Sequence, residues 1–494
     1  MKTTVSIQAA IRSLAVSTAL TMTFLPGLVS AQGFLAPPPV GTLPFGDEAL
    51  DGSGAPKANM KSLTQTDPGQ PIPSKNAALP DLDGSMPAYT ITVPGNYFLT
   101  ENLIGDKPIL VLSDDVTIDL RGHEIRYMPA GGATGTAIMA GPTPGGMALR
   151  THVRNGFVVG EWDAGVVLGE YSSVRDLNVA GAKSFAIAVG GQSTVHNCIV
   201  HGMALEGSDG SLGHAGILGG PGTVVSHSTA REIHGDGIRV EHASRVVDCV
   251  VTCVLGSGVV TGHTSSIEGT TSHMNNEKGF RCAEGTSIVN STSSENLQDG
   301  FHVRAGSVLA HCVSRMNLGD GYLAESLDPI DLIDPFANPE LTDNASSFLH
   351  CSATRNQRDG FRTTVNSTFT HCTADRNGGG VAEDPMGGLT PGDGFDVVDS
   401  CRLVNCMASR NTLSGIRAIE DNYIEQNTCH TNGMFGIDLV SPANTVIKNY
   451  VKYNPLGGIA VGGAAVPAAG MVGVAPILAA GYGAAPNPFS NFAF

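Results

Sequence analysis

The chain has 494 residues, including 63 glycines, and only 15% of its residues are charged. Hydrophobic residues make up 41%, so the chain has enough apolar side chains to fold and is not disordered throughout. The formal net charge of −17 argues against nucleic acids and anionic membranes, which proteins bind through clustered Lys and Arg. It also argues against an acidic polysaccharide, unless a cation bridges the two.

Residues 1–31 have the plan of a secretory signal peptide. Lys2 and Arg12 precede the apolar run LAVSTALTMTFLPGLV, and small residues lead up to Ala31. We expect cleavage near Ala31 and export to the periplasm, the cell surface or the medium. The run is short for a membrane anchor, and no other stretch has the composition of a transmembrane helix.

Residues 32–87 are rich in Pro, Gly, Ala and Ser, which predicts an irregular lead-in without a core of its own. Residues 89–103 and 108–125 are instead dominated by β-branched and apolar residues, with Pro-Gly and Asp-Asp turns between them. This pattern predicts strands.

A repeat with a period of 21 residues follows. A glycine that precedes an apolar or aromatic residue recurs at this interval at Gly216, Gly237, Gly258, Gly279, Gly300 and Gly321, and again at Gly394, Gly415 and Gly436. Breaks in the period predict insertions near 205–214, 325–343 and 378–392. Such a period indicates a solenoid.

Each repeat holds two short alternating segments joined by Gly/Ser and Asn/Asp turns, without helical periodicity. A left-handed β-solenoid would show hexapeptides and a shorter coil. The sequence therefore predicts an all-β, right-handed parallel β-helix over residues 88–460, with about fourteen coils. Residues 461–494, rich in Ala, Gly and Pro, are expected to form a C-terminal cap or tail.

The alignment of the repeats places like residues in columns, one coil apart. The position after the glycine is apolar throughout, as in Phe280, Phe301 and Tyr322, and predicts an inward stack. A cysteine column consists of Cys198, Cys249, Cys312, Cys351, Cys372 and Cys406. We expect it to be a buried packing ladder rather than a set of disulfides, because stacked neighbours have parallel Cβ vectors.

An asparagine column consists of Asn275, Asn296, Asn317, Asn356, Asn377, Asn411 and Asn432. Asparagine tolerates the left-handed backbone of a sharp turn, and stacked side-chain amides can hydrogen-bond in a ladder. This column therefore predicts a structural feature rather than a functional site.

The columns that could support chemistry are acidic, imidazole and guanidinium columns. Asp236, Asp299, Asp320, Asp359 and Asp393 precede the repeat glycine. They could bind Ca²⁺ or act as a glycosidase carboxylate pair, but Asp-Gly is also a common turn pair.

His311, His350 and His371 form a straight row, which suits an outward polar ladder better than a metal site. Arg355, Arg376 and Arg410 precede ladder asparagines and could hold a sugar carboxylate or neutralise the acidic column.

If a site exists, we expect it beneath the two long insertions, over the densest part of these columns. The candidates for acid–base or cation chemistry are Asp320, Asp359 and Asp393, and those for substrate binding are His302, Arg362 and Arg376. No cofactor is expected to be required, and Ca²⁺ is the candidate ion.

The segments ITVPGNYFLTENL and VTIDLRGHEI, the lead-in GAPKANMKSLTQTDPGQPI and the ending NPFSNFAF resemble exported bacterial right-handed β-helix repeat proteins of the pectate-lyase-like superfamily. The resemblance spans most of residues 54–494 and concerns a subgroup without an assigned activity. The superfamily includes polysaccharide lyases, hydrolases and epimerases, and phage tailspikes. Their motifs are missing here; in LDPID, for example, Ile330 stands where alginate epimerases have His.

Two functions remain open at this point. One is a non-catalytic protein that contacts polysaccharide or cell-surface glycan, or serves as a surface scaffold. The other is a polysaccharide lyase or glycoside hydrolase acting in the lateral groove. Convergence of acids and bases beneath the insertions would distinguish the second from the first.

Overall fold

The computed structural model describes residues 69–72, 89–105, 109–127, 135–143, 146–202, 214–325, 345–379, 392–465 and 492–493. The expected signal peptide lies outside these residues, as do nearly all of the three insertions and most of the lead-in and C-terminal segment. Within the described ranges the structure consists of strands and turns, and no helix there could cross a membrane.

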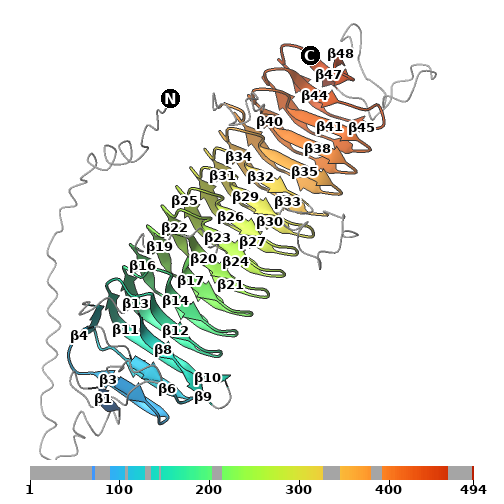
Figure 1. Cartoon of the computed structure of the whole chain (residues 1–494). Coiled ribbons are helices and arrows are strands. Elements are labelled where there is room, and N and C mark those ends of the chain that lie inside the picture. The colour runs from blue at the N-terminus through green and yellow to red at the C-terminus, as the bar shows by residue number, and fades with distance from the viewer. Residues whose placement is uncertain are drawn as a thin grey trace, which may run out of the picture. The chain divides into compact units, whose positions relative to one another are not determined.

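The chain winds into a right-handed parallel β-helix, as the sequence predicts (Figure 1). Each regular coil contributes one strand to one sheet, here called the one-strand sheet, and two short strands to the other, the two-strand sheet.

The one-strand sheet contains β2 (Tyr89–Ile91), β5 (Ile109–Val111), β8 (Thr136–Ala140), β12 (Ala164–Leu168), β14 (Phe185–Val189), β17 (Ala215–Gly219), β20 (Asp236–Val240), β23 (Val259–Thr261), β26 (Phe280–Cys282), β29 (Phe301–Val303), β32 (Tyr322–Ala324), β35 (Phe361–Val365), β38 (Phe395–Asp399), β41 (Ile416–Glu420), β44 (Phe435–Leu439), β47 (Gly457–Val461) and β48 (Ala464–Ala465). Its strands pair in parallel, except that β48 is antiparallel to β47.

The first row of the two-strand sheet contains β1 (Gln70–Ile72), β3 (Gly95–Leu99), β6 (Val116–Asp119), β15 (Thr194–His196), β18 (Val224–Ser226), β21 (Arg245–Val247), β24 (Ser266–Glu268), β27 (Ser287–Val289), β30 (Val308–Ala310), β33 (Ser347–Leu349), β36 (Thr368–Thr370), β39 (Arg402–Val404), β42 (Tyr423–Glu425) and β45 (Thr445–Ile447). The long strands β11 (Thr151–Val159) and β13 (Ser173–Ala180) pair with both rows.

The second row contains β4 (Leu103–Gly105), β7 (Glu124–Tyr127), β16 (Ile199–His201), β19 (Thr229–Arg231), β22 (Val250–Thr252), β25 (Thr271–His273), β28 (Thr292–Ser294), β31 (Val313–Arg315), β34 (Ser352–Thr354), β37 (Thr373–Asp375), β40 (Met407–Ser409), β43 (Thr428–His430), β46 (Tyr450–Lys452) and β49 (Phe492–Ala493). β9 (Pro142–Thr143) and β10 (Gly146–Met147) form a separate antiparallel pair.

The columns keep their register across the breaks in the period. Asn275 contacts Asn296 at a separation of 21 residues, Asn317 contacts Asn356 at 39, and Asn377 contacts Asn411 at 34. Each longer separation exceeds one coil by the length of an insertion. The coils on either side of each insertion therefore keep the same pairing of strands.

An aromatic stack fills the middle of the core, as predicted. The rings of Phe280, Phe301, Tyr322, Phe361 and Phe395 lie 4.6 to 4.9 Å apart on successive coils and are nearly parallel. All five are fully buried. The spacing equals that of neighbouring strands, so each coil places its ring directly on the last one.

The repeat glycine is required by close packing beneath it. A Cβ at Gly300 would lie 2.7 Å from the carbonyl oxygen of Gly321 and 2.8 Å from Nδ2 of Asn317. Any side chain at this position would therefore clash with the next glycine and with the ladder asparagine. This contact explains why the two columns recur together.

The asparagine ladder is confirmed, but the expected backbone reason is wrong. Nδ2 of Asn275 donates to Oδ1 of Asn296 at 2.8 Å, and the pattern continues coil after coil. The left-handed backbone belongs to the preceding residue, such as Met274 with φ of 54°, and not to the asparagine. The bend turns the asparagine inward, where its amide satisfies backbone groups that would otherwise be unpaired.

The cysteine column is a ladder of free thiols, as predicted. All ten cysteines lie in the described ranges and none forms a disulfide; nine are buried and Cys253 is exposed. Burial raises the pKa of the Cys198 thiol to about 12. The Cys198 thiol is therefore protonated, and the buried cysteines of the column pack as small apolar groups.

The lead-in is not irregular throughout. β1 pairs in parallel with β3, and Ile72 is fully buried in the core. The sequence does not predict this strand, because three residues flanked by Pro and Gly carry little periodic signal.

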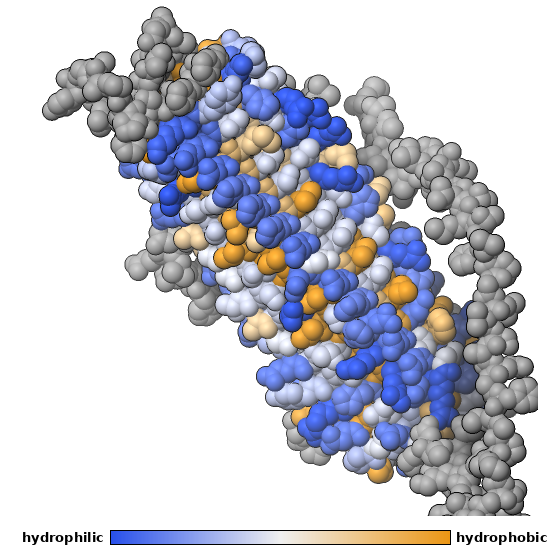
Figure 2. All heavy atoms as spheres, turned by 180° about the vertical axis from the view of Figure 1, so that it is seen from behind, coloured by the Kyte–Doolittle hydropathy of each residue, from blue (hydrophilic) through white to orange (hydrophobic). Residues whose placement is uncertain are grey.

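On the side of the β-helix turned away in Figure 1, hydrophobic residues form small groups among rows of hydrophilic ones (Figure 2).

Candidate functional site

The aspartate column is buried structure rather than an exposed site. Asp320, Asp359 and Asp393 are 1%, 8% and 4% exposed. Oδ1 of Asp320 accepts the backbone N–H of Asp359 at 2.9 Å, and Oδ1 of Asp359 accepts that of Asp393 at 2.7 Å. Each carboxyl thus caps the next coil.

The electrostatics of this column follow from its burial. Burial, together with the neighbouring carboxyls, raises the pKa of Asp320 and Asp359 well above the usual range. The same causes raise the pKa of Asp393 to about 7. Buried carboxyls one coil apart cannot all be ionised, so the column retains protons at neutral pH.

Arg362 provides a positive charge next to this column. Its Nη1 lies 3.9 Å from Oδ2 of Asp320, and its Nε lies 3.9 Å from Oδ2 of Asp396. Nη1 of Arg417 donates to Oδ1 of Asp396 at 2.8 Å. Arg362, Asp396, Arg417 and Asp438 are register partners on β35, β38, β41 and β44, so charges alternate along this part of the one-strand sheet.

The two other predicted substrate residues lie apart. His302 is only 5% exposed; its Nδ1 lies 3.8 Å from Oδ2 of Asp299 and its Nε2 lies 4.0 Å from Oε2 of Glu325. Arg376 follows β37 of the two-strand sheet, at a bend with φ of 56°. The structure therefore brings His302 and Arg362 onto one sheet with the aspartates, and places Arg376 on the other.

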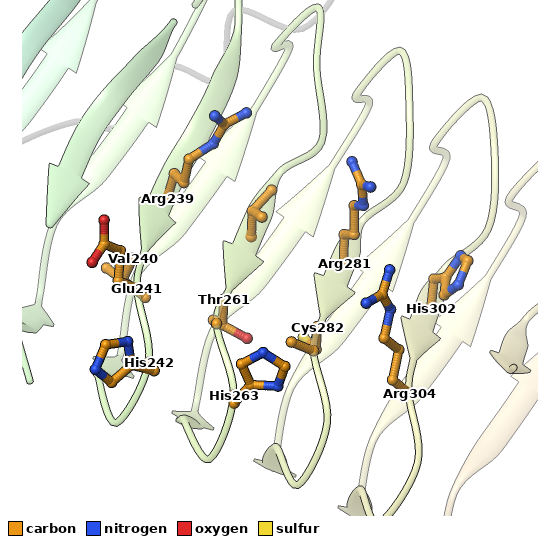
Figure 3. Close-up of a pocket in the computed structure, with 13 residues that line it drawn as sticks. Arg239, Val240, Glu241, His242, Thr261, His263, Arg281, Cys282, His302 and Arg304 are labelled. Carbon is orange, nitrogen blue, oxygen red and sulfur yellow. The ribbon is translucent and has the colours of Figure 1, made fainter. Parts of the chain in front are cut away.

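A groove lies over the one-strand sheet where β20, β23, β26 and β29 run side by side (Figure 3). We call it the basic groove. Its volume is about 470 Å³, and its polar lining consists of Arg239, Glu241, His242, Thr261, His263, Arg281, His302 and Arg304. Gly262 and Ala283 line its middle, where the flanking coils have Glu241 and Arg304. These small residues leave the surface hollow.

The basic groove differs in charge from the sheet beyond it. The register partners of Arg281 on the adjacent coils are Val260 and His302, whereas Asp396 lies between Arg362 and Arg417. The guanidinium of Arg239 is held by Asp236, with Nε to Oδ2 at 2.8 Å. Positive charge therefore collects in the groove although the whole chain is acidic.

The far side of the groove is formed by turns. Nδ1 of His263 lies 3.6 Å from Oε2 of Glu284, and both side chains are partly exposed. Cys282 lies beneath and is fully buried, which raises the pKa of its thiol to about 12. The thiol is therefore neutral, and the arginines and histidines are the groups in the groove that can bind an anionic ligand, whereas Glu241 is the acidic residue of the lining. Guanidinium groups bind carboxylates and sulfates through paired hydrogen bonds.

Within the described ranges, no group of three His, Cys, Asp or Glu side chains is arranged to hold a metal ion. His311, His350 and His371 form the predicted outward row, with rings stacked 5.1 and 4.9 Å apart and exposed. Parallel stacked rings direct their nitrogens side by side rather than toward one point. The Ca²⁺ expectation remains a prediction.

The chain is similar to several solved structures. No family model and no curated protein matches the chain. The periplasmic alginate epimerase AlgG matches over 70% of this chain and 85% of its own, with 11% identity and a TM-score of 0.43. The A-module of Azotobacter vinelandii mannuronan C-5 epimerase AlgE6 matches over 76% and 91%, with 13% identity and a TM-score of 0.40. Dettilon tailspike protein matches over 70% and 62%, with 12% identity and a TM-score of 0.37.

The likeness is one of fold. At these identities and TM-scores it assigns no activity to the chain.

Sequence reasoning found His302 but missed Arg239, Arg281 and Arg304. The signal was present: Arg239, Arg281 and His302 all stand two positions after a repeat glycine, facing outward from the sheet. The aspartates were predicted instead because they recur on more successive coils than these arginines do.

Proposed function

We propose that the basic groove binds an anionic glycan. The observation that supports this best is the position of Arg281, which lines the groove and has Val260 and His302 as its register partners on the adjacent coils. Arg239 and Arg304 add two further guanidinium groups within four coils. The groove is open and elongated along the coils, which suits a chain-like ligand better than a compact one. The acidity of the whole chain then limits binding to this one face.

A polysaccharide lyase or hydrolase is the second candidate, and His302 favours it. This side chain lines the groove and lies between the carboxyls of Asp299 and Glu325. An imidazole flanked by acids is suited to act as a general base or acid. Under this proposal the arginines would hold a sugar carboxylate while His302 removes or donates a proton. Asp320, Asp359 and Asp393 would then be structural.

Calorimetric titration of the mature protein with anionic and neutral polysaccharides tests the binding proposal. We expect only anionic polymers to bind, with affinity falling as salt increases. Arg281→Ala should weaken binding about tenfold, because it removes a charge-assisted contact. Arg315→Ala, an exposed arginine on β31 of the two-strand sheet, is the matched control and should bind normally. Binding of neutral polymers alone would refute the proposal.

The catalytic candidate is tested on the same polymers by product release and by absorbance of unsaturated ends. Turnover that His302→Asn abolishes while binding remains would establish it. Binding without turnover on every polymer that binds would leave the groove a binding site.

A further inference from the structure

Three exposed imidazoles stand in one row on the two-strand sheet. His311, His350 and His371 directly follow β30, β33 and β36, whose residues pair in register. All three have the same left-handed backbone, with φ of 55°, 52° and 54°. Each backbone N–H donates to the following coil, from His311 to the carbonyl of Leu349 at 2.9 Å and from His350 to that of Thr370 at 3.0 Å. The strand register therefore fixes the spacing of the row.

The ring nitrogens of this row are available to a ligand. Within the part of the chain that the structure describes, no hydrogen bond or ion pair engages these three rings. Other imidazoles are engaged: Nδ1 of His273 lies 2.9 Å from Oγ of Ser294, and Nε2 of His227 lies 3.6 Å from Oδ2 of Asp248. The outward positions on either side of the row are uncharged, namely Ala310, Val313, Leu349, Ser352, Thr370 and Thr373. No positive charge at these positions would repel a cation.

Two neighbouring rings are close enough to share one metal ion. The ring centroids of His311 and His350 lie 5.1 Å apart, and those of His350 and His371 lie 4.9 Å apart. A metal ion lies about 2.0–2.1 Å from each imidazole nitrogen, so a shared ion holds the two nitrogens roughly 3–4 Å apart. Neighbouring rings reach this separation when each tilts by roughly 1 Å toward the other, which exposed side chains can do. The two outer rings are two coils apart and cannot meet on one ion.

The imidazole ligands select the class of ion. Neutral ring nitrogens suit Cu²⁺, Ni²⁺ and Zn²⁺, whereas Ca²⁺ and Mg²⁺ are bound through oxygen. Two imidazoles leave the other coordination positions of the ion to water. Among these ions Cu²⁺ should bind most tightly, because it leads the general order of affinity for such ligands.

We propose that the row is a surface site for one divalent transition-metal ion, bound by His350 together with either His311 or His371. His350 is common to both pairs, so the row holds one ion at a time. The site lies on the two-strand sheet and does not depend on the basic groove or on the function proposed for it.

Calorimetric titration of the mature protein, without an affinity tag, with Ni²⁺ and Zn²⁺ tests the site. Asn is the replacement of choice, because Asn290 and Asn405 hold the adjacent positions of the same column with φ of 53° and 55°. His350→Asn should weaken binding about tenfold or more, because no neighbouring pair remains. His311→Asn or His371→Asn should weaken binding only about twofold, because one of two equivalent pairs remains. The double variant of the outer histidines should match His350→Asn.

His227→Asn is the matched control. His227 belongs to the same column, and its ring centroid lies 5.1 Å from that of His196, but the two rings are inclined at 64°. Nδ1 of His196 is also engaged, at 3.0 Å from Oγ of Ser226. We expect His227→Asn to bind Ni²⁺ and Zn²⁺ as the parent does. All proteins carry Cys253→Ser, which removes the exposed thiol as a competing ligand.

The outcomes decide between a shared pair and its alternatives. Parent-like affinity in His350→Asn, an equal loss in His227→Asn, or no binding of either ion by the parent would overturn the site. A loss in His311→Asn or His371→Asn as large as that in His350→Asn would overturn the sharing of the ion between two pairs. Circular dichroism of each variant should match that of the parent, since all the substituted histidines are exposed.

Discussion

Oδ1 of Asp320 accepts a hydrogen bond of 2.9 Å from the backbone N–H of Asp359, a residue 39 positions later in the chain and one coil away in space. The same contact joins Asp299 to Asp320 and Asp359 to Asp393. Four buried carboxyls therefore stand in one column. Oδ2 of Asp320 has no hydrogen-bond partner and lies 3.9 Å from Nη1 of Arg362.

This column predicts that the protein loses stability as pH rises. The pKa of Asp393 is raised to about 7 in the folded state, against about 4 in an unfolded chain. The folded state therefore binds more protons, and its stability is complete below the unfolded pKa and falls as pH rises through 7. For Asp393 alone the loss approaches roughly 4 kcal/mol. Denaturant unfolding at a series of pH values from 4 to 9 measures it.

Asp359→Asn should stabilise the protein above pH 7 and flatten this dependence. The amide keeps the oxygen that caps Asp393 and carries no charge. Asp421→Asn, at an exposed position, is the control and should leave the pH profile unchanged. An Asp359→Asn profile as steep as that of the parent would show that the column is not its source.

Asn317→Ala should destabilise the protein by about 2–4 kcal/mol. Oδ1 of Asn317 accepts both the backbone N–H and Nδ2 of Asn296, at 3.0 and 2.8 Å. The alanine would leave the buried backbone N–H without an acceptor and would leave Nδ2 with only its hydrogen bond to Oγ of Ser293. Asn276→Ala, one residue beyond the ladder and exposed, should cost less than about 0.5 kcal/mol. Chemical denaturation of the two variants checks this, and equal losses would contradict the ladder's role.

Phe361→Ala should cost about 3–5 kcal/mol because it opens a cavity in the aromatic stack. The ring lies between Tyr322 at 4.6 Å and Phe395 at 4.8 Å. Phe157, which is 44% exposed, provides the control substitution Phe157→Ala. Thermal unfolding followed by circular dichroism should give a lower midpoint for Phe361→Ala only.

A thiol reagent should modify one cysteine per native molecule and all ten after denaturation. Cys253 is exposed, whereas the other nine are buried and their thiols are shielded. Cys253→Ser should remove the native reaction altogether. Fewer than ten reactive thiols in denaturant, without reductant, would indicate disulfides and contradict the free-thiol ladder.

The sequence was sufficient for the fold because a period of 21 residues places like side chains at like heights. The Phe, Cys and Asn columns could each be read from that spacing, since packing in a solenoid repeats with the coil. The period alone does not say which side of the sheet a residue faces at a turn. Asp320 therefore looked like a candidate for catalysis, although the bend before it directs its carboxyl inward.

The groove could not be predicted for a related reason. Its shape depends on Gly262 and Ala283, two small residues at positions where other coils have larger ones. Its charge depends on Arg239, Arg281 and Arg304, which line it together. Both are departures from the repeat, so neither forms a column of recurring residues.

The aspartate column also has a polarity along the β-helix. In each contact the carboxyl belongs to the earlier coil and the N–H to the later one. A completed coil thus presents an open acceptor to the segment that follows it in the chain. The asparagine ladder has the opposite polarity, because there the accepting oxygen belongs to the later coil. The two columns together therefore join each coil to both of its neighbours.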